Sequence, residues 1–310
     1  MEPLTRHTLR GSWSTLLLPI QSDDRIDYSC LQDELDYITR VGVSGVYTNG
    51  TAGEFFNQTE DEFDKISALT AEICHKTSIP FQIGASHMSP IISLERIIRT
   101  KSLGPGAYQI ILPDWVATTR QEQLSFLNRM AEAAAPVPLV LYNPGHAKAV
   151  LNPEDFAQLA DAVPALIGIK VAAGGPDWYS TMRTLEIPLA VFVPGHRLAT
   201  GIKEGVGVGA YSNVACLNPL AAQQWYQMMR EDLDEALRLE RRIGAFFEQC
   251  ILPYYSAGYS DMALDKYLAA VGGWTDIGTR LRWPYRWIDR KDVQKARTMG
   301  RNLIPEFFDE

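Results

Sequence analysis

Short apolar runs alternate with amphipathic stretches along most of this chain. From Ser12 to about residue 230, runs rich in Val, Ile and Leu recur between longer segments of helical periodicity. Continuous apolar runs are typical of parallel strands that are buried on both faces, and amphipathic stretches are typical of the helices that cover such a sheet. The expected strands are 13–19, 45–48, 81–85, 108–112, 138–142, a run that ends at 170, 189–193 and 206–211.

The segments between these strands have the pattern of helices. The first turn of one of them, Thr59-Glu-Asp-Glu62, has the form of a capping box. The expected helices are 28–41, 59–76, 90–103, 120–134, 153–162, 178–185, 198–204 and 219–230. Eight β–α units in this length match a (β/α)8 TIM barrel, an α/β fold. A doubly wound sheet would want a glycine-rich turn between a strand and a helix, whereas Gly205–Gly209 precedes and enters a strand.

The pattern becomes wholly helical after Asp232. Further helices are expected at 234–252, 260–271 and 291–303. The sequence therefore predicts a barrel catalytic domain over residues 1–231 and a C-terminal helical extension, residues 232–310, that packs on the barrel. A chain of 310 residues can bury a large core without a metal ion or a disulfide.

Charge and composition exclude several classes of partner. The net charge is −8 with no basic cluster, so nucleic acid is not an expected partner. The four cysteines are far apart and resemble reduced thiols. The N-terminal segment lacks the apolar core of a secretory signal, and no apolar run has the length of a membrane span. The expected location is the cytoplasm, with no membrane partner.

Lys170 ends the apolar run Ala-Leu-Ile-Gly-Ile at 165–169. The carboxyl ends of barrel strands face one shared cavity, which is where such folds place their chemistry. An amine that is partly desolvated there has a lowered pKa and can attack a carbonyl carbon. The alternative is a lysine that only extends from a strand end into water, and this segment by itself leaves both interpretations open.

Other strand ends bring polar groups to the same cavity. Tyr142 precedes Lys170 by one strand–helix–strand step, so the two side chains are expected to be neighbours. A phenol beside an imine-forming lysine can donate and accept protons. Gly50 and Ala52 offer backbone N–H groups, and Thr51 offers a hydroxyl, that suit a carboxylate. A 2-keto acid held between this turn and Lys170 would form a Schiff base, whose protonated form is an electron sink.

Four motifs together carry a resemblance to a known family. They are GTAGE at 50–54, YNP at 142–144, GIK at 168–170 and GVGVGAYSNVACLNP at 205–219. In this order the chain resembles the dihydrodipicolinate synthase / N-acetylneuraminate lyase family of class I, Schiff-base aldolases. The resemblance implies a barrel with Lys170 as the Schiff-base lysine, Tyr142 as the proton-transfer tyrosine and the 50–53 loop as the site for a pyruvate carboxylate. It also implies catalysis without a metal or other cofactor, and a homotetramer built as a dimer of dimers.

The chain departs from the family pattern at several positions. Ala52 stands where the synthase type usually carries a second hydroxyl, and Pro113-Asp114-Trp115 replaces a Pro-Tyr-Tyr segment. Gly195 is followed by His196-Arg197 where the sialic acid lyase has acidic residues. The expected function is therefore a lyase or aldolase acting on a pyruvate-like 2-keto acid by aldol cleavage or condensation, and neither authentic dihydrodipicolinate synthase nor sialic acid lyase. A 2-keto-3-deoxy sugar acid dehydratase that uses the same imine is the alternative.

Several residues have open roles in this interpretation. Glu54 is a general base or, preferably, a brace for its loop, and Ser212 and Asp114 either contact substrate or form local hydrogen bonds. Histidines follow three strands, at 87, 146 and 196, and could form a zinc site for a metal-dependent aldolase, although no H-x-H spacing supports one. A non-catalytic keto-acid-binding barrel is a further alternative, which the Lys170/Tyr142 pair argues against. The residues expected to bind substrate are Gly50, Thr51, Ala52, Tyr211, Gly195, His196, Arg197 and Ser212.

Overall fold

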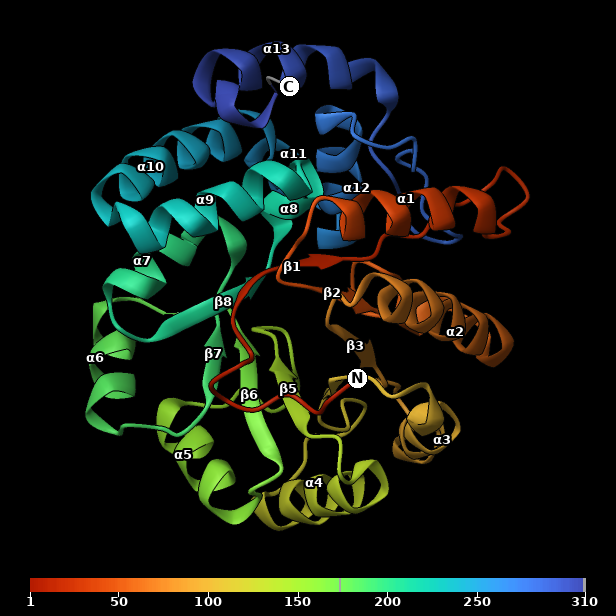
Figure 1. Cartoon of the computed structure of the whole chain (residues 1–310), viewed down its shortest axis with the longest axis vertical. Coiled ribbons are helices and arrows are strands. Elements are labelled where there is room, and N and C mark those ends of the chain that lie inside the picture. The colour runs from red at the N-terminus through yellow and green to blue at the C-terminus, as the bar shows by residue number, and fades with distance from the viewer. Residues whose placement is uncertain (173, 309–310) are drawn as a thin grey trace.

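Eight parallel strands form a closed barrel in the order of the chain (Figure 1). The computed structural model describes residues 1–172 and 174–308, so Ala173, within the small-residue segment after Lys170, and residues 309–310 lie outside the described residues. The strands are β1 (Gly11–Thr15), β2 (Gly45–Thr48), β3 (Phe81–Gly84), β4 (Ala107–Ile110), β5 (Leu139–Asn143), β6 (Leu166–Val171), β7 (Ala190–Phe192) and β8 (Gly207–Tyr211). The prediction of a TIM barrel with C-terminal helices is confirmed.

Helices surround the barrel and continue beyond it. Those between the strands are α1 (Tyr28–Arg40), α2 (Glu60–Thr77), α3 (Pro90–Thr100), α4 (Arg120–Ala134), α5 (Pro153–Ala162), α6 (Pro176–Thr184) and α7 (Leu198–Lys203). After β8 come α8 (Asn213–Leu217), α9 (Pro219–Glu231), α10 (Leu233–Cys250), α11 (Leu252–Ser256), α12 (Asp261–Gly272) and α13 (Val293–Leu303). Short 3-10 turns are η1 (Phe55–Asn57), η2 (Lys101–Leu103), η3 (Gly195–Arg197), η4 (Arg290–Asp292) and η5 (Pro305–Phe307).

The expected boundaries are mostly within a few residues of those observed. Thr59 and Glu62 form the predicted capping box at the start of α2. The expected strand 13–19 is wrong in extent, because β1 already ends at Thr15. Leu16, Leu17 and Leu18 are buried although they lie beyond the strand, and periodicity cannot distinguish a buried connection from a buried strand. The short helices α8 and α11 were not expected from the sequence.

Apolar side chains form two layers, one inside the barrel wall and one outside it. The inner cluster fills the barrel with side chains from alternate strand positions, while the outer cluster joins the strands to the helices. Members of the inner cluster include Trp13, Tyr47, Val140, Phe192 and Tyr211. Leu9 belongs to this cluster and is fully buried, so the segment before β1, which crosses the barrel in Figure 1, contributes to its core.

The C-terminal helices pack on one side of the barrel, at the top of Figure 1. In this region α10 packs against α9 and α13, while α12 packs against α8, the short helix that directly follows β8. This contact brings α12 to the carboxyl end of the strands. The boundary at residue 231 between the barrel domain and the C-terminal extension stays a prediction. In the described part of the chain, no helix combines the length and apolar character required to cross a membrane.

Candidate active site

Lys170 and Tyr142 are direct neighbours at the carboxyl ends of β6 and β5. Their Cα atoms are register partners in the parallel pairing of these strands. The Lys170 Nζ lies 4.0 Å from the centre of the Tyr142 ring, 5.5 Å from that of Tyr211 and 5.8 Å from that of Tyr47. The amine therefore lies among three aromatic rings, and the expected proximity of Lys170 and Tyr142 is confirmed. Tyr47, on β2, was not singled out from the sequence.

The surroundings of Lys170 and Tyr142 shift the pKa of each side chain in the direction that favours its neutral form. Desolvation lowers the pKa of Lys170 to about 8, although the carboxyl groups of Asp265 and Asp261 act in the opposite direction. Desolvation also raises the pKa of Tyr142 to about 12, and the same two aspartates contribute in that direction. At neutral pH about a tenth of Lys170 is thus a free amine, while Tyr142 keeps its proton.

The loop between β2 and η1 has an unusual backbone conformation. Residues Asn49 and Glu54, which flank it, have left-handed φ angles of 54° and 52°. Such angles in non-glycine residues cost energy and cluster at functional sites. Gly50 allows a close approach, because a Cβ atom there would lie 2.3 Å from the ring of Tyr47. The Thr51 hydroxyl lies next to the Tyr142 phenol, and this interaction opposes the rise in its pKa.

Glu54 is held by the C-terminal extension. Its Oε1 accepts a hydrogen bond of 2.9 Å from Lys266 Nζ, and its Oε2 accepts one of 3.0 Å from the backbone N–H of Arg282. Both side chains of the ion pair are buried, at 0% and 1% exposure. With both oxygens engaged, Glu54 fixes the end of the loop, as the sequence interpretation favoured.

Gly195, His196 and Ser212 form a connected group after β7 and β8. The carbonyl oxygen of the Asn213 side chain accepts from the His196 backbone N–H at 3.1 Å, and its amide nitrogen lies 2.9 Å from His196 Nδ1. Desolvation lowers the pKa of His196 to about 4, so the imidazole is neutral at physiological pH. A Cβ atom on Gly195 would lie 2.5 Å from the Ser212 hydroxyl, so glycine permits this close packing.

The other substrate-binding candidates differ in exposure. Arg197 is exposed, whereas Tyr211 is buried and donates a hydrogen bond of 2.8 Å to Gln82 Oε1 inside the barrel. The Ser212 hydroxyl accepts from the Ala215 N–H and thereby caps α8. Asp114 accepts from the Lys148 N–H at 2.7 Å, which is the local hydrogen bond that the sequence left as one alternative.

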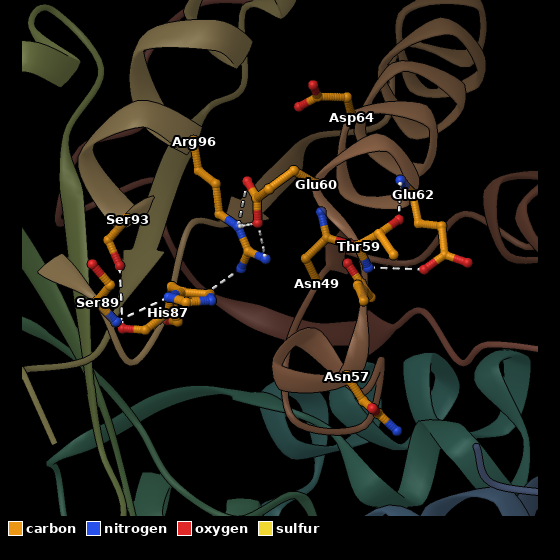
Figure 2. A network of polar contacts seen from close by, with 12 residues as sticks. Asn49, Asn57, Thr59, Glu60, Glu62, Asp64, His87, Ser89, Ser93 and Arg96 are labelled. Atoms are coloured by element: carbon orange, nitrogen blue, oxygen red, sulfur yellow. Dashed lines mark hydrogen bonds and ion pairs between the residues drawn. The ribbon is translucent and has the colours of Figure 1, made fainter. Parts of the chain in front are cut away.

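His87 belongs to a polar network on the side of the barrel formed by α2 and α3 (Figure 2). Its Nδ1 accepts a hydrogen bond of 2.9 Å from the Ser89 N–H. Nearby, the fully buried Arg96 donates to Glu60 and to the Ser86 carbonyl, and its guanidinium lies over the Phe63 ring. The network joins α2 and α3 to the loop after β3, and its role is therefore structural.

The three histidines do not form a metal site among the residues described. His87 and His196 have the separate partners given above, and His146 is exposed. Across residues 1–172 and 174–308, no group of three or more His, Cys, Asp or Glu side chains is placed to hold a metal ion. These observations give the metal-dependent alternative no support from geometry.

Two acidic residues of α12 were missed by the sequence interpretation. Asp261 and Asp265 are one helical turn apart and act electrostatically on both Lys170 and Tyr142. Desolvation raises the pKa of Asp265 to about 7; the charge of Asp261 adds to this rise, and that of Lys170 opposes it. The sequence did carry one signal, since Asp265-Lys266 interrupts an otherwise apolar helix. What it could not show is that this helix faces the strand ends.

Comparison with known proteins identifies similar chains. The family model described as "Dihydrodipicolinate synthetase family" matches residues 8–295. A 4-hydroxy-tetrahydrodipicolinate synthase of Ralstonia nicotianae is 28% identical over 241 residues, which cover 76% of this chain and 80% of the relative. A second such synthase, from Macrococcus caseolyticus, is 26% identical over 216 residues, covering 69% of this chain and 72% of the relative.

Solved structures share the fold across nearly the whole chain. A prophage protein of the dihydrodipicolinic acid synthase family from E. coli K12, solved in complex with pyruvate, superimposes with a TM-score of 0.82 at 19% identity, covering 95% of this chain and 98% of that one. A sialic acid aldolase of Ruminococcus gnavus, solved as a catalytic lysine mutant, gives a TM-score of 0.83 at 18% identity, with coverage of 99% and 100%. At these identities the similarity establishes the fold.

Proposed function

The chain belongs to the dihydrodipicolinate synthetase family, a family of aldolase-type lyases, and from this premise we propose that it is a class I lyase in which Lys170 forms an imine with a pyruvate-like 2-keto acid. The observation that carries this proposal is the position of the Lys170 amine, whose pKa is lowered to about 8 by desolvation and which lies 4.0 Å from the centre of the Tyr142 ring. Binding alone would require neither a nucleophile nor a proton donor beside it.

Lys170 and Tyr142 have separate roles in the proposed reaction. The free amine of Lys170 attacks the keto carbon, and the carbinolamine then loses water to leave a protonated imine. Tyr142, which retains its proton at neutral pH, donates a proton to the departing hydroxyl and later accepts one. The protonated imine accepts the electron pair of the bond at the next carbon, so that carbon–carbon cleavage gives an enamine and a carbonyl product.

The loop 50–53 provides the proposed site for the keto acid carboxylate. Thr51 offers a hydroxyl, and Gly50 and Ala52 offer backbone N–H groups, next to Tyr142. Gly195, His196, Arg197, Tyr211 and Ser212 stay proposals for the remainder of the substrate. Ala52 lacks the second hydroxyl, Trp115 stands in the segment that replaces Pro-Tyr-Tyr, and His196-Arg197 replaces the acidic residues of the lyase pattern. We therefore propose a substrate other than those of the authentic synthase and the sialic acid lyase.

Assembly and location form a separate part of the proposal. From the family we expect a homotetramer in the cytoplasm that requires no metal ion. Light scattering on the purified protein tests the assembly, and a mass near four times 34.6 kDa is the expected result.

Borohydride trapping tests the chemistry directly. The protein is incubated with pyruvate and borohydride, with and without a chelator, and its intact mass is measured before peptide mapping. The expected result is an adduct on Lys170 that survives chelation and disappears in Lys170→Ala. Lys148→Ala is the matched control, because Lys148 is an exposed lysine in the loop after β5 and should leave the adduct unchanged. An adduct lost only in Lys148→Ala, or activity abolished by the chelator with no adduct, would overturn the proposal.

A further inference from the structure

Three tyrosine rings from different strands surround the Lys170 amine. The Nζ atom lies over the ring of Tyr142 on β5, of Tyr211 on β8 and of Tyr47 on β2, at 4.0, 5.5 and 5.8 Å from the respective ring centres. We refer to these three rings as the aromatic cage. All three distances are within the limit of about 6 Å at which the face of an aromatic ring attracts a cation.

Packing and one hydrogen bond hold Tyr47 and Tyr211 in place. Their ring centres are 4.8 Å apart, and Tyr211 also packs against Phe192 at 4.6 Å and against Trp13 at 6.1 Å. The Tyr211 phenol donates a hydrogen bond of 2.8 Å to Gln82 Oε1, and both tyrosines are buried. Rings that are held in this way keep their orientation toward the amine, so no conformational entropy has to be lost when a cation forms there.

The rings of the aromatic cage carry no net charge at physiological pH. Burial raises the pKa of each phenol above its ordinary value, so Tyr47, Tyr142 and Tyr211 all keep their protons. A neutral ring still attracts a cation, because its quadrupole makes the face of the ring negative. The other titratable groups that influence the ionisation of the amine are Asp261 and Asp265 on α12 and the Cys216 thiol on α8.

We propose that Tyr47 and Tyr211 are positioning residues that act through Lys170: the faces of their rings stabilise its nitrogen in the cationic forms, the ammonium and the protonated imine. The role in the imine rests on the Schiff-base function proposed above. Desolvation disfavours any cation at this position, whereas the protonated imine has to persist until it accepts an electron pair from the substrate. Attraction to the ring faces offsets part of that cost, and it adds no negative charge that would repel the carboxylate of a keto acid.

Fluorinated phenylalanines test the contribution of the ring face with little change in ring shape. Tyr47→Phe keeps the ring, and mono-, di- and trifluorophenylalanine at the same position withdraw electrons from its face in steps. The measurement is the pH dependence of Lys170 acetylation by trace acetic anhydride, followed by peptide mapping; this reagent requires no imine, and Lys170 is partly exposed to it. The midpoint is expected near pH 8 in the wild type. We expect it to fall by about half a pH unit from Tyr47→Phe to the trifluorinated variant, because the ammonium loses stabilisation.

Phe192 provides the matched control. It is fully buried in the same inner cluster, but in the described part of the chain its ring makes no cation–aromatic contact with the amine, so the same fluorinated series there should leave the midpoint unchanged. No fall at position 47, or an equal fall in both series, would overturn the inference. If the position-47 variants do not fold, the series that starts from Tyr211→Phe decides by the same criteria. Absence of any pyruvate adduct in the wild type, with the fall in midpoint present, would instead refute the Schiff-base function and leave the effect of the cage on the ammonium in place.

Discussion

The Lys170 amine lies 4.0 Å from the centre of the Tyr142 ring, and the two residues are Cα partners across β5 and β6. Parallel pairing fixes this relationship, because partners in adjacent strands project to the same side of the barrel wall. A cation over an aromatic face is stabilised, which partly offsets the cost of desolvating the ammonium. The same geometry places a phenol where a proton must be transferred during imine formation.

Removal of the Tyr142 hydroxyl should slow turnover without removing the nucleophile. We expect Tyr142→Phe to lower the rate of keto acid turnover by about 10²–10⁴-fold, the usual contribution of a positioned acid or base. Lys170 remains present, so borohydride should still trap pyruvate after long incubation. Single-turnover kinetics measure the effect, and Tyr255→Phe, at an exposed tyrosine, serves as the control. A Tyr142→Phe variant with the wild-type rate would remove Tyr142 from the mechanism.

The lowered pKa of Lys170 predicts a specific pH dependence of imine formation. Since the pKa is about 8 instead of 10.5, the reactive neutral amine increases tenfold per pH unit up to about pH 8 and then levels off. The measurement is the initial rate of pyruvate trapping over a range of about pH 6 to about pH 10. A rate that continues to rise to about pH 10 would indicate an ordinary, solvated lysine.

The Glu54–Lys266 pair should contribute to stability through its burial. Lys266→Met leaves the Glu54 carboxylate buried without its partner, and we expect a loss of about 3–5 kcal/mol in the free energy of unfolding. The double variant Glu54→Gln/Lys266→Met leaves no uncompensated charge and should recover a large part of this loss. Urea denaturation of the single and double variants forms the mutant cycle. Additive losses would show that the two side chains do not interact.

Asp265 should reduce stability at neutral pH. Its pKa is raised to about 7 in the folded protein from 3.8, so the unfolded chain loses this proton at lower pH. The contribution of Asp265 to the free energy of unfolding therefore falls as the pH rises from about 4 to 7, and this loss is complete above that window. Asp265→Asn should raise the melting temperature at pH 8 by roughly 2–4 °C for each kcal/mol regained. The difference in melting temperature between Asp265→Asn and the wild type should vanish near pH 4. An Asp265→Asn variant that is less stable than the wild type at pH 8 would contradict the raised pKa of Asp265.

Much of the barrel could be predicted because its signals are local. Continuous apolar runs and helical periodicity identify elements within a few neighbouring residues, and the capping box at Thr59 marks the start of α2 with local hydrogen bonds. The same locality explains the error at β1, where Leu16–Leu18 are buried without belonging to the strand. Burial by itself does not specify hydrogen bonding between strands.

The sequence by itself determined the barrel and the neighbouring Lys170 and Tyr142, because the order of β–α units dictates which strands are adjacent. Only the tertiary structure decided what surrounds that pair. Asp265 and Lys266 lie about a hundred residues beyond Lys170, on a helix whose own pattern does not say against which part of the barrel it packs. Long-range packing of α12 places the Lys266 side chain on Glu54, and the carboxyl group of Asp265 acts on the pKa of the reactive amine. The charge around Lys170 therefore depends on the tertiary structure and could not be predicted from any local sequence pattern.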